Sequence, residues 1–186
     1  MTDAMKTYVR IVDRMNRWIG RIVMYGIFVM MGILLWSSIS KAFFLPSLWT
    51  LEMAQFAMVA YYILGGPYAV QMGSNVRMDL LYSELSDRRK AQIDAITVLF
   101  LIVYLGFMLW GGWDSLMYSF QYGGERSPTA WRPYLWPIKT IMVTGIFLML
   151  LQAISELFKD ILRLNGHDMG PKGVDETRLS NGEDTA

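Results

Sequence analysis

Four long stretches without a charged side chain stand out in this sequence of 186 residues. They cover residues 22–40, 53–76, 95–113 and, in a shorter form, 140–155. A helix that crosses the hydrocarbon core of a bilayer, about 30 Å thick, needs about 20 residues. The first three stretches come close to this length. The fourth does so if residues 135–139 are included, with the Lys139 ammonium reaching back to the membrane surface. The pattern predicts an all-α integral membrane protein with four transmembrane helices.

Two other interpretations of the apolar stretches fit the sequence less well. Long apolar helices can be buried in a large soluble bundle, but only 18% of the residues are charged, against roughly a quarter in an average soluble domain. The polar covering for such a bundle is therefore too small. The first stretch is longer than the apolar core of a signal peptide, roughly 7–15 residues, and Trp36 stands where a cleavage site requires small residues. We therefore expect an uncleaved span.

The basic residues predict the orientation of the chain. Most of the 17 Lys and Arg residues lie in the N-terminal segment, between the second and third stretches, or in the C-terminal segment. The other two connections and the span ends beside them hold only Lys41, Arg126, Arg132 and Lys139. Because connections rich in Lys and Arg stay in the cytoplasm, both termini are expected there. The expected membrane domain covers residues 21–164, with spans at about 21–44, 50–73, 92–116 and 135–158.

The N-terminal segment, residues 1–20, has an amphipathic pattern. Apolar side chains recur at spacings of three and four residues: Met5, Tyr8, Val12, Met15 and Ile19. Basic side chains fall on another face: Arg10, Arg14, Arg17 and Arg21. The pattern is typical of a helix that lies on the surface of the lipid bilayer, with its basic groups near anionic head groups. The alternative is a cytoplasmic extension of the first span that packs on another protein.

The connections and the C-terminal end are rich in polar or turn-forming residues. In the second connection, Asn75 is suited to cap a short helix and Ser86 to cap the helix that follows. The third connection contains a group of aromatic and proline residues: Trp131, Pro133, Tyr134, Trp136 and Pro137. This group indicates either an aromatic belt at head-group depth or a docking surface for an extracytoplasmic protein. Residues 165–186 are expected to form a disordered tail.

Few side chains in this sequence are suited to chemistry. The absence of cysteine excludes disulfides and thiol catalysis, and the single histidine, His167, belongs to the polar tail. A net charge of +1 gives no support for a nucleic-acid partner. The sequence shows neither a Ser-His-Asp triad nor a glycine-rich phosphate loop. We therefore expect the chain not to be an enzyme and to hold no metal ion.

Two acidic residues lie at the ends of expected spans. Glu52 opens the second span, where the helix dipole stabilises its negative charge; pairing with another subunit and ion coupling are the alternatives. Asp114, at the outer end of the third span, is expected to be solvated or paired with a neighbour such as Arg126 or Lys139. The sequence places no pair of acids at the bilayer midplane, where a secondary transporter usually has its coupling groups. The chain is therefore expected to work with partners.

Several motifs, in their order along the chain, resemble a known family. Glu52 opens the second span and the sequence Leu64-Gly65-Gly66-Pro67-Tyr68-Ala69 closes it. Asn75-Val76-Arg77-Met78-Asp79 follows, and then come Ser127-Pro128, Trp136-Pro137 and Gln152. Over roughly residues 10–163 this order is similar to that of the small membrane subunit of tripartite ATP-independent periplasmic (TRAP) transporters.

The resemblance implies a multi-pass protein of the bacterial inner membrane with two partners. In TRAP transporters a periplasmic substrate-binding protein captures an organic acid, and a large membrane subunit carries the substrate and sodium sites. The small subunit braces the large one and helps the binding protein dock. It would hold no cofactor, since sodium binds to the large partner subunit. Family members often have a histidine where this chain has Asn75, so no proton-transfer role is implied there.

The resemblance also implies roles for individual residues. Five residues would contact the large subunit or organise that contact: Trp49, Glu52, Gly65, Gly66 and Tyr68. Three would shape a cytoplasmic turn: Asn75, Arg77 and Asp79. Three would belong to a periplasmic docking surface: Arg126, Trp131 and Arg132.

Two rival functions come from other classes of membrane protein. A self-sufficient, proton-coupled small exporter would use Glu52 as its coupling acid and form a homodimer. A four-span membrane enzyme, such as a glutathione-dependent one, would need a cofactor site lined by arginine and tyrosine and facing the bilayer. The arginines of this chain lie mostly in the connections, which disfavours the enzyme.

Overall fold

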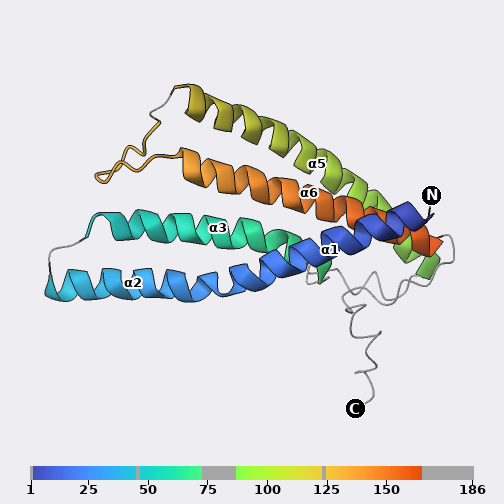
Figure 1. Ribbon diagram of the computed structural model, residues 1–186, viewed down its shortest axis with the longest axis horizontal. Coiled ribbons are helices and arrows are strands. Elements are labelled where there is room, and N and C mark those ends of the chain that lie inside the picture. The colour runs from blue at the N-terminus through green and yellow to red at the C-terminus, as the bar shows by residue number, and fades with distance from the viewer. Residues whose placement is uncertain (1, 45–46, 73–86, 123–124, 165–186) are drawn as a thin grey trace, which may run out of the picture.

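The computed structural model of the protein describes residues 2–44, 47–72, 87–122 and 125–164. These residues form five helices: α1 (Thr2–Met24), α2 (Gly26–Phe43), α3 (Trp49–Gln71), α5 (Asp87–Gln121) and α6 (Trp136–Leu164). Four of them lie side by side in the order α2, α3, α6, α5, and α1 crosses α3 and α6 (Figure 1). Within the described ranges no β-strand occurs beyond one isolated bridge between Arg126 and Tyr134. The predicted all-α class is confirmed.

The bundle has two distinct ends. At one of them, which we call the hairpin end, α2 is connected to α3 and α5 to α6 (Figure 1). At the opposite end, which we call the α1 end, α1 lies across its neighbours and the N-terminus is found (Figure 1). The two ends carry different sets of polar side chains, which are described below.

In the part of the chain that the structure describes, three helical stretches are long and apolar enough to cross a membrane: Met5–Phe43, Ile96–Gln121 and Trp136–Leu162. The first consists of α1 and α2, which follow one another around Tyr25. Helix α3 contains the predicted second span but is not among the three, since Gln55, Pro67 and the adjacent tyrosines Tyr61 and Tyr62 lower its hydropathy. The number of spans and the side on which the termini lie therefore stay predictions.

Helix α1 is amphipathic, and one of its faces is already covered by the same chain. Val9, Val12, Asn16 and Gly20 are buried against α3 and α6, whereas the Arg10, Arg14 and Arg21 side chains are exposed. In the apolar set predicted from the sequence, Val12 is buried and the other four are half-buried. Instead of lying apart from the bundle, α1 packs on α3 and α6.

Small or polar residues face neighbouring helices, while many large apolar side chains face outward. The buried residues of α2 are Ser37 and Ser40, and the Thr50 hydroxyl donates a hydrogen bond of 3.1 Å to Ser37 Oγ. An apolar core lies between α5 and α6 around Leu105 and Ile146. Small and hydroxyl side chains suit helix contacts within lipid, where apolar surface gains nothing by turning inward.

Helices α3 and α6 pack closely against each other at Gly145. A Cβ atom added to Gly145 would lie 2.2 Å from Cγ2 and 3.1 Å from the carbonyl oxygen of Ile63. That carbonyl is the one that loses its helical donor to Pro67, four residues later, because proline has no N–H. Helix α3 nevertheless continues through Gly65-Gly66-Pro67, since it runs from Trp49 to Gln71.

Several predicted features lie outside the described residues. They are the turn residues Asn75, Arg77 and Asp79, the proposed cap Ser86, and the tail of residues 165–186 with His167. Helix α5 begins at Asp87, directly after Ser86.

Candidate functional site

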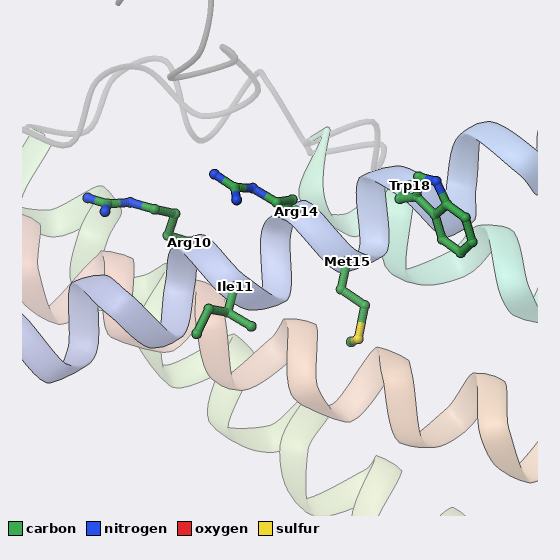
Figure 2. A pocket seen from close by; sticks show the side chains of 5 residues that line it. All are labelled: Arg10, Ile11, Arg14, Met15 and Trp18. Carbon is green, nitrogen blue, oxygen red and sulfur yellow. The ribbon is translucent and has the colours of Figure 1, made fainter.

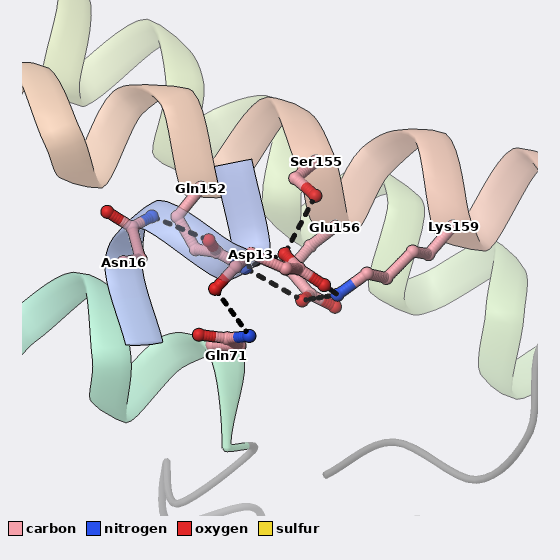
Figure 3. Close-up of polar contacts among 7 residues, drawn as sticks. All are labelled: Asp13, Asn16, Gln71, Gln152, Ser155, Glu156 and Lys159. Carbon is pink, nitrogen blue, oxygen red and sulfur yellow. Dashed lines mark hydrogen bonds and ion pairs between the residues drawn. The ribbon is translucent and has the colours of Figure 1, made fainter. Parts of the chain in front are cut away.

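Polar side chains from three helices meet inside the bundle at the α1 end (Figure 3). We call them the polar cluster, and its seven members are Asp13 and Asn16 of α1, Gln71 of α3, and Gln152, Ser155, Glu156 and Lys159 of α6. Asn16, Gln152, Ser155 and Glu156 are buried. Buried polar groups cost free energy unless they are paired, so the pairing of this cluster determines whether α1 can pack here.

One ammonium bridges two carboxylates in the polar cluster. Lys159 Nζ lies 2.6 Å from Asp13 Oδ2 and 2.8 Å from Glu156 Oε1. The Lys159 side chain is only 15% exposed. Because water screens buried charges weakly, removal of one partner would leave the others uncompensated. The Lys159–Asp13 ion pair joins α6 to α1.

Asp13 also accepts hydrogen bonds from several uncharged side chains. Its Oδ1 accepts hydrogen bonds from Gln152 Nε2 at 3.0 Å and from Ser155 Oγ at 3.1 Å. Its backbone carbonyl accepts a hydrogen bond from Gln71 Nε2 of α3 at 3.2 Å. Asn16 Nδ2 donates a further bond of 2.7 Å to Gln152 Oε1. Residues of α3 and α6 thus hold one turn of α1 in place.

The spacing of these residues explains why they meet. Gln152, Ser155, Glu156 and Lys159 recur at intervals of three, one and three residues, which places them along one stripe of α6. Asp13 and Asn16 lie three residues apart on the α1 face that meets this stripe. Next to them, Tyr8 Oη donates a hydrogen bond of 3.3 Å to the Leu151 carbonyl.

Sequence reasoning identified only one member of the polar cluster. Gln152 is part of the family resemblance, whereas the sequence pattern assigns no role to Asp13 or Lys159. The available signal was the polar stripe from Gln152 to Lys159, together with the Asp13–Asn16 pair at helical spacing. The stripe indicates a partner helix, but it does not say which one.

At the hairpin end, residues 125–135 form a short loop closed by backbone hydrogen bonds. The Ser127 N–H donates to the Pro133 carbonyl at 3.0 Å, and the Leu135 N–H donates to the Glu125 carbonyl at 3.1 Å. The Arg126 guanidinium lies 4.4 Å from the centre of the Tyr134 ring. Arg132, which directly precedes Pro133, has a φ of 51°, in the left-handed region that favours glycine. The loop therefore has a defined shape.

A second ion pair anchors this loop to the helices. Lys139 Nζ lies 2.5 Å from Glu125 Oε2, and Ser119 also donates a hydrogen bond to that oxygen. The sequence suggested Arg126 or Lys139 as partner for Asp114 if Asp114 were paired. This pairing is wrong, since Lys139 pairs with Glu125 and Arg126 stacks on Tyr134. Asp114 is exposed, which agrees with the solvated alternative.

The Glu125 carboxylate should make the stability of the hairpin end depend on pH. Hydrogen bonds from Lys139 and from Ser119 lower the pKa of Glu125 below its ordinary value. When the pKa of a carboxylate is lower in the folded state than in the unfolded state, its ionised form stabilises the fold at any pH above the unfolded-state pKa. This stabilisation is lost as the pH falls through the folded-state pKa. We expect the unfolding temperature of the wild type to approach that of Glu125→Gln between about pH 6 and about pH 3. Circular dichroism in detergent measures both. A constant difference between the two proteins over this range would contradict the assignment.

The residues predicted to contact or organise a partner at α3 lie in two kinds of environment. Trp49 is exposed, and a Cβ atom added to Gly65 would meet no atom within 4 Å. Glu52 is only 6% exposed, and its Oε2 finds no hydrogen-bond partner among the described residues. Gly66 faces Met149 of α6, and Tyr68 packs against Gly20 of α1. Trp49 and Gly65 are therefore open to a partner, and the other three face this chain.

The structure brings the predicted docking residues together in the loop of the hairpin end. Arg126, Trp131 and Arg132 are all exposed there. No group of three or more His, Cys, Asp or Glu residues suited to hold a metal ion occurs in the part of the chain that the structure describes. Exposed loop residues and intrachain ion pairs are the main polar features of the described residues at the two ends of the bundle.

Comparison with known families identifies the chain. A family model described as tripartite ATP-independent periplasmic transporters, DctQ component, matches residues 30–163. The matched range covers well over half of the 186 residues, starts within α2 and ends within α6. No curated protein matches the sequence. DctQ is a family of transporter components and not of enzymes. The chain belongs to the DctQ family, the small membrane component of TRAP transporters.

Proposed function

We propose that this chain is the scaffold subunit of a TRAP secondary transporter in the bacterial inner membrane. It braces a large, sodium-coupled subunit that moves like an elevator, and it helps a periplasmic binding protein dock for the uptake of an organic acid. The family match over residues 30–163 carries this proposal. The intrachain ion pairs of Lys139 and Lys159 agree with it, since neither ammonium is free for ion coupling.

In this proposal α2, α3, α5 and α6 all cross the membrane and both termini are cytoplasmic. The α1 end then faces the cytoplasm and the hairpin end faces the periplasm. The exposed arginines Arg10, Arg14 and Arg21 of α1 support this orientation, because basic residues favour the cytoplasmic side. Helix α3 contains no stretch as apolar as those of the other three helices, which suits a span shielded from lipid by neighbouring protein.

The proposed contact with the large subunit involves open positions of α3. Trp49 and Gly65 would touch the partner directly, since both are open in this chain. Glu52, Gly66 and Tyr68 would organise that contact from within the bundle. Asn75, Arg77 and Asp79 would shape the cytoplasmic turn that follows.

Copurification tests the scaffold role. The tagged full chain should bring down a multispan partner when both are expressed from their genomic neighbourhood. Trp49→Ala with Gly65→Leu should reduce the recovered partner several-fold, because both changes alter positions of α3 that are open in this chain. Trp110→Ala with Gly106→Leu, which changes the same residue types on exposed positions of α5, is the matched control. Failure of the wild type to retain any multispan partner would reject the scaffold role.

Charge reversal in the loop tests the docking role. We expect Arg126→Glu with Arg132→Glu to lower uptake at limiting binding protein by roughly tenfold, because reversed rim charges slow association. The amount of assembled membrane complex should not change. Lys41→Glu, an exposed charge reversal near the same end, serves as control. Uptake that is unchanged at limiting binding protein would show that these two arginines take no part in docking.

The rival exporter function rests on a specific observation, the buried Glu52 oxygen without a hydrogen-bond partner among the described residues. A self-sufficient exporter would show proton-driven efflux from vesicles that contain this chain alone, and Glu52→Gln would abolish it. The scaffold proposal expects no such efflux.

A further inference from the structure

The outer face of α1, opposite the polar cluster, carries a groove of about 460 Å³ (Figure 2). It is lined by Arg10, Ile11, Arg14, Met15 and Trp18. These residues precede the range that matches the DctQ family, which begins at residue 30. Neither the scaffold role nor the docking role uses them.

The apolar and the basic side chains of the groove are both exposed. Ile11 is 62% exposed and Trp18 is 67% exposed, although both are large and apolar. Arg10 and Arg14 are exposed too, and within the described ranges neither guanidinium makes a hydrogen bond or an ion pair. Among the described residues, the groove thus combines two unpaired cations with uncovered apolar surface.

The helical spacing places the basic side chains on one edge of the groove and the apolar side chains on the other. Arg10 and Arg14 lie four residues apart, so their side chains are neighbours on one edge and extend to the same side in Figure 2. Ile11, Met15 and Trp18 recur at intervals of four and three residues and form the adjacent apolar edge. A ligand that matches this arrangement has an anionic group and an attached hydrocarbon chain.

The fold holds this face in place before any ligand arrives. Asp13 and Asn16, on the other side of the same helical turns, are bonded to α6 through Lys159 and Gln152. The α1 backbone therefore cannot rotate freely, and less conformational freedom is lost on binding. Because α1 leads directly into the apolar helix α2, the groove also lies close to a membrane boundary.

We propose that this groove binds one anionic phospholipid. Its phosphate lies between the Arg10 and Arg14 guanidinium groups, which suit phosphate because each can donate two parallel hydrogen bonds. One acyl chain lies along Ile11 and Met15, and the Trp18 indole sits at head-group depth, where tryptophan is favoured. A zwitterionic lipid lacks the net charge that the two arginines require.

Native mass spectrometry of the delipidated full chain in detergent tests the site, with phosphatidylglycerol as the probe and phosphatidylcholine as the reference. Each basic residue contributes about 1 kcal/mol to binding at an anionic surface, so Arg10→Gln with Arg14→Gln should weaken the first bound phosphatidylglycerol about 30-fold. Phosphatidylcholine binding should be weak and unchanged by this double variant. Equal phosphatidylglycerol binding by the wild type and the double variant would overturn the proposal.

Matched variants separate a defined site from diffuse attraction. Arg21→Gln removes an exposed arginine of the same helix that does not line the groove, and it should change binding much less than Arg14→Gln. Equal effects of the two would overturn the site. Trp18→Ala should weaken binding, whereas Trp110→Ala, at a tryptophan on α5 that is 68% exposed, should not. Displacement of the lipid by millimolar glycerol phosphate would show that the groove recognises soluble phosphate, which also contradicts the proposal.

Discussion

Replacing Lys159 with methionine should lower the free energy of unfolding by about 3–5 kcal/mol, the cost of leaving buried charges without their partner. The methionine keeps most of the side-chain volume but leaves the Asp13 and Glu156 carboxylates facing each other without a cation. The first element to detach should be α1, since Asp13 is its main link to α6. Denaturant unfolding in detergent, followed by circular dichroism, measures the loss.

A compensated variant separates charge from packing. If the cost comes from uncompensated charge, adding Asp13→Asn and Glu156→Gln to Lys159→Met should restore much of the stability, because replacement of a whole buried ion group is often close to neutral. Lys41→Met, which removes an exposed lysine from α2, should change stability by less than about 0.5 kcal/mol. A similar loss in the compensated variant and in Lys159→Met would show that the lysine acts through its packing and not its charge.

The second large effect is expected at Gly145. A leucine there would place its Cβ against Ile63, whose Cγ2 and carbonyl oxygen already lie 2.2 Å and 3.1 Å from the position of that atom. Helices α3 and α6 must then separate, and we expect a loss of about 3 kcal/mol, at the upper end for overpacked cores. Thermal unfolding in detergent measures the change.

Gly106→Leu is the matched control for Gly145→Leu. A Cβ atom added to Gly106 of α5 meets nothing within 4 Å, so this variant should be neutral or gain up to about 1 kcal/mol from helix propensity. A loss of equal size at both glycines would show that the close approach of α3 and α6 is not responsible.

The helices could be predicted from the sequence because their signal is local. Apolar runs of roughly 20 residues indicate membrane helices regardless of what they contact, and the structure has α2, α5 and α6 at the expected places. The amphipathic pattern of the N-terminal segment likewise predicts a helix, which the structure shows as α1. The less apolar α3 is also helical, but its polar residues keep it below the hydropathy of a typical span.

The polar contacts could not be predicted in the same way. Asn16 and Gln152 lie 136 positions apart, so their hydrogen bond depends on how α1 folds back over α6. A pattern within one helix shows that a polar face needs a partner, but the partner is chosen by tertiary packing. The same limit applies at the hairpin end, because the loop geometry brings Glu125 to Lys139 and turns Arg126 towards Tyr134.

The close contact at Gly145 also limits how the bundle can deform. A slide of α6 by one turn would bring Ile141 or Met149 to the place of Gly145, against the Ile63 carbonyl. Neither side chain fits there unless the helices first move apart. A force on the loop between α5 and α6 should therefore tilt α3 and α6 together, because the two helices cannot slide past each other. This tilt would displace α1, which packs on both helices.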